Sequence, residues 1–217
     1  SMIRSNIKFI LNYILKKINY IIFFLRLKFN SKTKNIKIVI GSSAHKVGFS
    51  NINYKGWLMT DLPWFDIQDL NKMLKFFSDK KASIILAEHV FEHLDIEEGY
   101  KAIKNLKQIL CKNGKIRLAV PDGYHSNQNY ITLVKPHGSG GAEHKILYNY
   151  KSIKQIFDKD FEIRYLEYFD ERKNFIYNDW QNNNKDGYIK RSRFTDHRND
   201  EKNINYSSLI LDAYLKK

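Results

Sequence analysis

The sequence alternates short apolar runs with longer segments in which apolar residues recur every three or four positions. Short β-branched runs that end in glycine, an acid or proline are typical of buried parallel strands, and the longer spacing is typical of amphipathic helices. The runs that predict strands are Asn35–Gly41, Gly56–Asp61, Ala82–Ala87 and Lys115–Val120, and the helical pattern occupies Asp66–Phe77, Ile96–Cys111 and Tyr150–Phe157. Alternation of this kind predicts a parallel sheet covered by helices.

The C-terminal third adds two more strand patterns, Phe161–Phe169 and Ser207–Leu215. The stretch 170–205 between them is polar and contains a basic cluster at 190–193. Two strands joined by a polar excursion are expected to form an antiparallel pair at one side of the sheet. Within the helical segments, we expect Asp66 to cap the first helix and Asn113-Gly114 to end the second.

Residues 1–34 form a separate unit ahead of the α/β domain at 35–217. Apolar residues follow one helical stripe, with basic residues around it. The stripe consists of Ile3, Ile7, Ile10, Ile14, Ile18, Ile21, Leu25 and Phe29. The longest charge-free run, Ile18–Leu25, is far shorter than the roughly 20 residues of a spanning helix. Two alternatives remain, a helix that packs on the domain or on a second copy, and a helix that lies in the plane of a membrane.

The chain of 217 residues carries a formal net charge of +14 and a single cysteine, Cys111. One cysteine excludes an internal disulfide and a cysteine-based zinc cluster, and it favours a reducing, cytoplasmic location. The positive charge fits a basic soluble surface, an anionic membrane leaflet at its inner face, or a phosphorylated or nucleotide-linked substrate. No nucleic-acid-binding signature accompanies it, so nucleic acid is not an expected partner, and the sequence does not indicate an oligomeric state.

Polar residues follow nearly every predicted strand. In an open parallel sheet, ligands bind beyond the carboxyl ends of the strands. The residues at these ends are Gly41, Ser42 and Ser43; Asp61 and Leu62; Glu88 and His89, with Glu92 and His93 close behind; and Asp122, Gly123, Tyr124 and His125. A glycine allows close approach to a ligand, and a carboxylate at a strand end can bind a ribose diol. We therefore expect a binding site at this edge.

These segments resemble the class I S-adenosylmethionine (SAM) dependent methyltransferases, in particular small bacterial ones associated with surface-polysaccharide biosynthesis. The resemblance spans roughly residues 36–215. It lies in IVIGSS at 38–43, GWLMTD at 56–61, AEHVFEHL at 87–94, NLKQILCKNGKIRLAVPDG at 105–123 and HKILYNYKSIKQIF at 144–157. It implies a Rossmann-like, doubly wound and mostly parallel seven-stranded sheet with an antiparallel last strand. The chain departs from the family in its glycine loop, reduced to Gly-Ser-Ser, and in lacking a strand pattern between 61 and 82.

The resemblance also implies the cofactor, SAM, with S-adenosylhomocysteine as product, and a methyl acceptor that is a hydroxyl or phosphate-linked group of a sugar or surface-glycan intermediate. It would place Gly41, Ser42 and Ser43 against the methionine part of SAM. Asp61 would hold the ribose and Leu62 would border the adenine. Glu88 and His89 would line the floor beside the sulfonium, and the segment from Asp122 to His144 would shape the acceptor pocket.

A hydroxyl acceptor needs a proton acceptor, and histidine suits that task near neutral pH. The candidate catalytic residues are His89, His93, Asp122 and His125, and the candidate acceptor-binding residues are His137, His144 and Tyr148. No metal ligand belongs to this interpretation.

Two other functions remain open. His89, Glu92 and His93 match the H-x-x-E-H pattern of one metallopeptidase class, with two histidines on one helical face and the glutamate as base. The reduced glycine loop also fits a non-catalytic module that keeps the methyltransferase fold.

Overall fold

The computed structural model describes residues 36–42, 54–63, 65–77 and 80–216, together with residues 10–11, 13–15, 17–18, 21–22 and 25. Its strands are β1 (Ile36–Ile40), β2 (Leu58–Met59), β3 (Ala82–Glu88), β4 (Leu110–Pro121), β5 (Phe161–Phe169), β6 (Phe175–Tyr177) and β7 (Ser208–Leu215). They form one seven-stranded sheet in the order β2-β1-β3-β4-β7-β5-β6.

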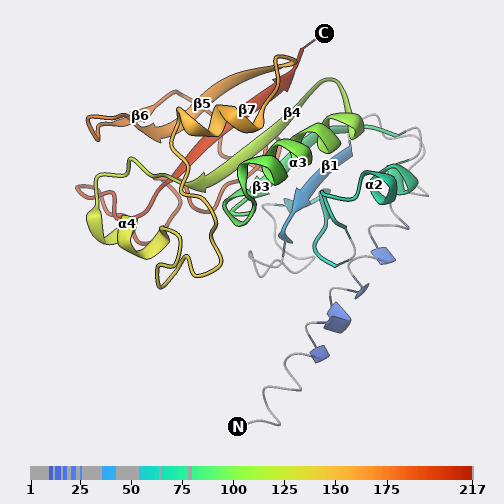
Figure 1. Ribbon diagram of the computed structural model, residues 1–217, viewed down its shortest axis with the longest axis horizontal. Helices are drawn as coiled ribbons and strands as arrows, with labels where there is room; N and C mark the ends of the chain where they lie inside the picture. The colour runs from blue at the N-terminus through green and yellow to red at the C-terminus, as the bar shows by residue number, and fades with distance from the viewer. Residues whose placement is uncertain are drawn as a thin grey trace.

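The sheet is mostly parallel, as predicted. The four strands β2, β1, β3 and β4 pair in parallel. The last strand, β7, is antiparallel to both of its neighbours, β4 and β5, and Figure 1 shows the arrows of β4 and β7 running in opposite directions. The predicted antiparallel pairing of the two C-terminal strands is therefore confirmed. The short strand β6, which pairs with β5, was not predicted.

The helices are α2 (Leu70–Phe77), α3 (Ile96–Ile109) and α4 (Gln128–Val134), with 3₁₀ helices η3 (Phe91–His93) and η4 (Ser152–Ile156). Asp95 caps α3 with a reciprocal capping box to Glu98. Helix α2 begins later than predicted, because Asp69 accepts a hydrogen bond from the Lys72 amide at 2.9 Å. Asp66 instead accepts from the Gln68 amide in the preceding turn. Helix α3 ends at Ile109, ahead of the predicted Asn113-Gly114 stop, because Leu110 is already extended.

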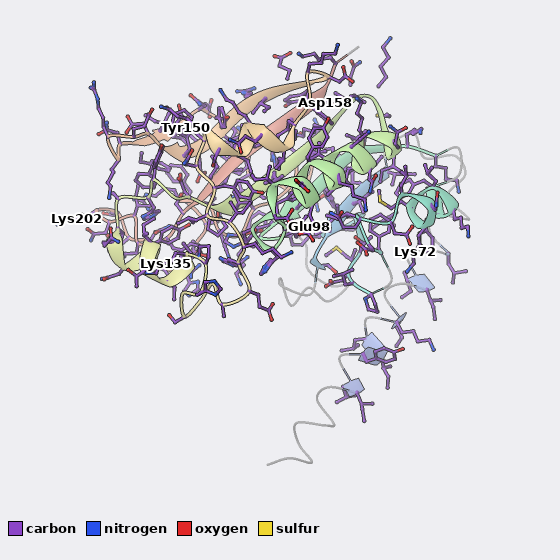
Figure 2. The ribbon with its side chains drawn as sticks, viewed as in Figure 1. Lys72, Glu98, Lys135, Tyr150, Asp158 and Lys202 are labelled. Atoms are coloured by element: carbon purple, nitrogen blue, oxygen red, sulfur yellow. The ribbon has the colours of Figure 1, made fainter. Side chains whose placement is uncertain are left out.

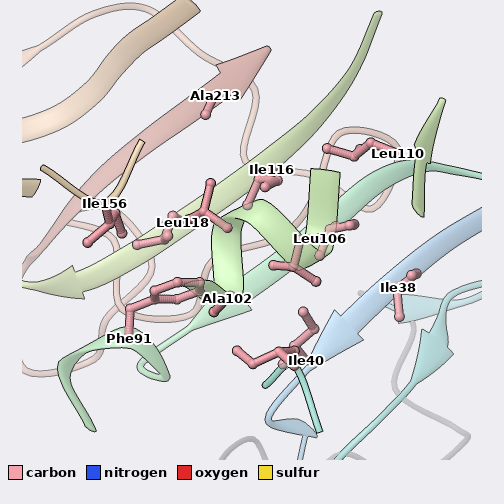
Figure 3. Close-up of a cluster of buried hydrophobic side chains, with 14 of the residues drawn as sticks. Ile38, Ile40, Phe91, Ala102, Leu106, Leu110, Ile116, Leu118, Ile156 and Ala213 are labelled. Carbon is pink, nitrogen blue, oxygen red and sulfur yellow. The ribbon is translucent and has the colours of Figure 1, made fainter. Parts of the chain in front are cut away.

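Helices α2, α3 and η4 cover one face of the sheet (Figure 1). Side chains alternate along a strand, so Ile85 and Ala87 of β3 enter this layer and Leu86 enters the opposite one. The helix-covered core includes Phe91, Ala102, Leu106, Leu118 and Ile156, shown in Figure 3. Burial of these apolar side chains is the main force that holds the helices on the sheet.

The other face carries Val39, Leu86 and Ile210 of the sheet, packed against Trp57, Trp180 and Ile189. The polar segment 178–207 supplies part of this layer. Buried carboxylates of the sheet hold this segment in place. One of them accepts hydrogen bonds from the segment directly, and another positions an arginine side chain that donates a hydrogen bond to the segment.

One such carboxylate is Glu167 of β5, which accepts from the Ser192 hydroxyl at 2.6 Å and the Arg193 amide at 2.9 Å. Another is Asp212 of β7, which binds the Arg117 guanidinium through two contacts of 2.7 Å. Arg117 in turn donates to the Gly187 carbonyl at 2.7 Å. A segment without regular structure is thus fixed by specific polar contacts.

The N-terminal segment is helical at each of its described residues. The described members of the apolar stripe, Ile10, Ile14, Ile18, Ile21 and Leu25, have exposed fractions of 42–55%. Among the described residues no helix is long and apolar enough to cross a membrane. The other stripe positions lie outside the described residues.

Candidate functional site

The predicted cofactor residues follow two neighbouring strands. Gly41 lies at the end of β1 with a φ of 69°, a left-handed conformation that favours glycine. The Ser42 amide donates to the Thr60 carbonyl at 3.0 Å, which joins this turn to the end of β2, immediately before Asp61. Leu62 follows and is 56% exposed. The structure therefore brings Gly41, Ser42, Asp61 and Leu62 to one edge of the sheet, while Ser43 lies outside the described residues.

Gly41 also lies against the segment that follows β3. A Cβ atom at position 41 would come within 2.6 Å of the Val90 side chain, so no larger residue fits there without displacement. Val90 directly precedes η3, which carries Glu92 and His93. The turn after β1 thus adjoins the histidine-rich segment after β3.

Glu88 lies at the end of β3 and holds a neighbouring segment. Its side chain is fully buried, and its two oxygens accept from the Lys190 amide at 3.1 Å and the Arg191 amide at 2.8 Å. Burial raises the pKa of this carboxyl above its ordinary value. Glu88 thus anchors segment 178–207 over this strand end, a contact that the sequence pattern could not show.

A cluster of one carboxylate and three histidines lies just beyond β3, and of its members Glu92 and His144 are buried. His89 Nδ1 is 3.0 Å from Glu92 Oε1, and His144 Nε2 is 3.9 Å from the same oxygen. The rings of His93 and His144 meet edge to face with 4.9 Å between centroids. Ligand atoms of Glu92, His93 and His144 all lie within 4.8 Å of one another. We call these four residues the Glu92 cluster.

Main-chain contacts orient the histidines. His93 Nδ1 is 3.2 Å from the Glu143 carbonyl, and His144 Nδ1 is 2.7 Å from the Val134 carbonyl. A carbonyl oxygen can only accept, so each Nδ1 carries the hydrogen and each neutral ring keeps a lone pair on Nε2. His89 differs, because its Nε2 pairs with the Ser208 hydroxyl at 3.0 Å.

Glu92 is the least satisfied member of the cluster. It is fully buried, and among the described residues neither carboxylate oxygen has a partner in hydrogen-bond geometry. The 3.0 Å approach of His89 Nδ1 is within ion-pair distance but is not aligned as a hydrogen bond. Burial raises the pKa of this carboxyl to about 7. An unsatisfied carboxylate of this kind is costly in an apolar interior and gains free energy from a cation or donor.

Of the predicted acceptor-binding residues, only His144 belongs to the cluster. Tyr148 is fully buried in the helix-covered core, and burial raises the pKa of its hydroxyl. His137 is exposed, in a left-handed turn with φ of 62°, outside the cluster. The structure therefore does not bring His137 and Tyr148 to a common open site with His144.

Asp122 and His125 form a separate buried turn after β4. The Asp122 carboxylate accepts from the Tyr124 amide at 2.9 Å and the Phe169 amide at 2.7 Å, and burial raises its pKa to about 7. His125 Nδ1 accepts from the Asn127 amide, and burial lowers the pKa of the ring to about 4. Both predicted catalytic groups thus use their acceptor atoms to hold the backbone, which leaves the Glu92 cluster as the better source of a base.

A basic cavity of about 310 Å³ opens beside the cluster. It is lined by Leu133, Val134, Gly140, Lys190, Arg191, Asp196, His197, Arg198 and Tyr206. Val134 accepts from His144, and the Tyr206 ring stacks on His89 with 6.2 Å between centroids, so two wall residues also contact the cluster. The sequence showed the basic residues at 190–193 as a patch, but their proximity to the histidines depends on the fold.

The H-x-x-E-H interpretation required His89 and His93 on one helical face. In the structure His89 has a left-handed φ of 56° and precedes η3, which is only three residues long. The two histidines therefore do not form the helical ligand pair that the H-x-x-E-H pattern requires.

No known protein-family model matches the chain, and no curated protein matches it at the level of sequence. Solved structures with a similar fold include magnesium protoporphyrin IX methyltransferase from Synechocystis, which is 12% identical with a TM-score of 0.43 and covers 93% of this chain and 83% of its own. A SAM-dependent methyltransferase from Archaeoglobus fulgidus is 14% identical with a TM-score of 0.43, and the match covers 92% of this chain and 94% of that protein. A SAM-dependent methyltransferase from Thermotoga maritima, described as a possible histamine N-methyltransferase, is 13% identical with a TM-score of 0.43. That match covers 99% of this chain and 97% of that protein.

Proposed function

We propose that this protein transfers a methyl group from SAM to a hydroxyl or phosphate-linked acceptor. The observation that carries the proposal is the placement of Gly41, in a left-handed turn, and Asp61 at the ends of the adjacent parallel strands β1 and β2. Ligands of open α/β sheets bind at this edge. A turn without a side chain accommodates the methionine part, and the carboxylate accepts hydrogen bonds from the ribose hydroxyls.

Methyl transfer is an in-line displacement, so the protein mainly has to align the nucleophile, methyl carbon and sulfur. A hydroxyl acceptor must also lose its proton. We assign proton acceptance to the Glu92 cluster, because it adjoins the turn after β1 through Val90 and adjoins the basic cavity through Val134 and Tyr206.

Calorimetric titration with SAM and S-adenosylhomocysteine tests the cofactor assignment. We expect both ligands to bind, and Asp61→Ala to weaken binding by about 1–3 kcal/mol through loss of charged hydrogen bonds. Asp179→Ala is the matched control, because Asp179 is an exposed carboxylate on a different loop. Absence of binding to the unaltered chain would refute the proposed function. Equal affinity in Asp61→Ala would refute only the ribose assignment.

We further infer that the acceptor is anionic, such as a phosphorylated or nucleotide-linked sugar of a surface-glycan intermediate. The basic cavity supports this, because Lys190, Arg191 and Arg198 line it beside the Glu92 cluster. Arginine and lysine side chains at a cavity wall favour phosphate or carboxylate groups.

We also infer that the N-terminal segment holds the enzyme at an anionic membrane surface. Its apolar stripe is exposed at every described position, and basic residues including Lys8, Lys17 and Lys28 accompany the stripe. Exposed apolar side chains with a basic polar face are typical of helices that lie in the plane of a bilayer. An enzyme that acts on lipid-linked glycan intermediates would benefit from this location.

A further inference from the structure

The Glu92 cluster has the composition and the geometry of a metal site. Glu92, His93 and His144 each offer one ligand atom, and the three atoms lie within 4.8 Å of one another. Two imidazoles and one carboxylate form a ligand set found in catalytic zinc sites and in other divalent transition-metal sites. We propose that these three residues bind one divalent transition-metal ion, with Zn²⁺ as the representative ion.

The histidine tautomers support this proposal. Because His93 and His144 donate through Nδ1 to the carbonyls of Glu143 and Val134, the Nε2 lone pairs of both neutral rings are available to a metal. Metal-binding histidines characteristically donate their other ring N–H to a backbone carbonyl or carboxylate, which fixes the orientation of the ring. The cluster therefore has the outer hydrogen bonds of a metal site in place.

The burial of Glu92 is the second, independent observation. Among the described residues, its fully buried carboxylate has no aligned hydrogen-bond donor, although such groups are almost always paired. A cation bound to this carboxylate would neutralise it, and His89 Nδ1, 3.0 Å from Oε1, would help to orient the group. Metal–ligand bonds of about 2.0–2.2 Å place ligand atoms roughly 3.4 Å apart. His144 Nε2 lies 3.9 Å from Glu92 Oε1, and the three ligand atoms lie within 4.8 Å of one another, so binding requires the side chains to move closer by up to about 1.4 Å.

The loop that delivers His144 is built for close packing. A Cβ atom at Gly141 would come within 2.8 Å of His144 Nδ1 and 2.5 Å of the Lys135 carbonyl, so a side chain at this position would displace the histidine. At the other end of the loop, Lys145 pairs with Glu98 of α3 at 2.7 Å. Figure 2 labels Lys135, at the start of this loop, and Glu98 of α3, the partner of Lys145. His144 is thus held between fixed ends.

His93 is half-buried, whereas Glu92 and His144 are buried, so the ion would be reached from the side of His93. Three protein ligands leave at least one coordination position for water or an oxygen of a bound molecule. An anionic molecule bound in the nearby basic cavity would supply such an oxygen. Metal binding itself needs neither SAM nor an acceptor. An ion held by Glu92, His93 and His144 would leave His89 as the proton acceptor of the Glu92 cluster.

The test is metal binding to the full chain, prepared without a histidine tag and stripped with a chelator. Isothermal titration with Zn²⁺ should give one site per chain, and Co²⁺ should produce the visible absorption of a protein-bound ion. Glu92→Gln and His144→Gln should each weaken Zn²⁺ binding at least tenfold. The control His137→Gln removes an exposed histidine from the same loop and should bind as the unaltered chain does. Cys111→Ser should also bind normally, which excludes the thiol as the source of the signal.

Thermal unfolding gives a second readout that does not require activity. Zn²⁺ should raise the melting temperature of the unaltered chain and of His137→Gln, because a ligand that binds only the folded state stabilises it. The same addition should leave Glu92→Gln unchanged, and an unliganded unfolding transition for that variant would show that it folds. No Zn²⁺ or Co²⁺ binding by the unaltered chain, or equal losses in His137→Gln and His144→Gln, would overturn the proposal. Such a result would leave SAM binding at Asp61 unaffected.

Discussion

At the scale of single residues, His125 shows how burial sets charge. Its ring stacks on Tyr130 at 4.0 Å and lies 4.4 Å from Phe169, and burial lowers its pKa to about 4 from an ordinary value of about 6.5. The unfolded chain therefore binds a proton at this residue between those two pH values, while the folded chain does not. Stability from this source is present above about pH 6.5 and is lost as the pH falls toward 4.

We predict that lowering the pH from 8 to 5 destabilises the unaltered chain by about 1–2 kcal/mol more than it destabilises His125→Gln, which cannot titrate. Urea unfolding at both pH values measures the difference. His137→Gln serves as the comparison, because it replaces an exposed histidine with the same residue as His125→Gln does. Parallel pH profiles for the unaltered chain and His125→Gln would contradict the assigned pKa.

At the scale of elements, the N-terminal segment exposes the apolar stripe residues that the structure describes. Ile14 and Ile18 belong to the exposed stripe, with exposed fractions of 46% and 42%. We predict that the full chain co-sediments with vesicles containing anionic phospholipid and that Ile14→Glu with Ile18→Glu reduces the bound fraction at least fivefold. The variant loses the binding free energy of two isoleucine side chains inserted into the bilayer, each worth roughly 1.5–3 kcal/mol. Its new glutamates are also repelled by the anionic lipid.

The matched control for that experiment places glutamates at Leu133 and Phe194, two exposed apolar residues of the α/β domain. If this double variant loses vesicle binding as strongly, the N-terminal stripe is not the attachment surface. Equal binding of the unaltered chain to neutral and anionic vesicles would show that the basic residues contribute nothing.

At the scale of the whole molecule, charge of one sign dominates. The net charge of +14 and the basic lining of the cavity create a field that attracts anions, and dissolved salt screens that field. We predict that kcat/KM for a phosphorylated sugar acceptor falls several-fold between 50 and 300 mM salt, as attraction between charges requires. The value for the corresponding neutral sugar should change little.

Lys190→Gln should lower kcat/KM for the phosphorylated acceptor about three- to tenfold, the effect of one charge pair at a partly exposed site. Lys101→Gln, an exposed change on α3, is the control and should have no effect. A neutral acceptor that shows the same salt dependence would argue against an anionic substrate.

The sequence by itself determined the alternation of the main strands and helices but not β6 or α4, because hydrophobic periodicity is a local property and is weak in short elements. It predicted both ends of β5 correctly and located β1, β3, β7 and α3. It also predicted that the last strand, β7, is antiparallel. It also placed Gly41 and Asp61 at one edge, since the ends of adjacent parallel strands must meet there. The predicted start of α2 was wrong, because two nearby residues that can cap a helix, Asp66 and Asp69, compete for that role.

Only the tertiary structure decided which polar residues share a site. Nothing local distinguishes Glu88, which binds the amides of segment 178–207, from Glu92, which faces three histidines without an aligned donor. His144 joins Glu92 from 52 positions along the chain. Burial, hydrogen-bond partners and pKa depend on contacts between distant segments, so residue types alone could suggest acid–base chemistry but could not say where it resides.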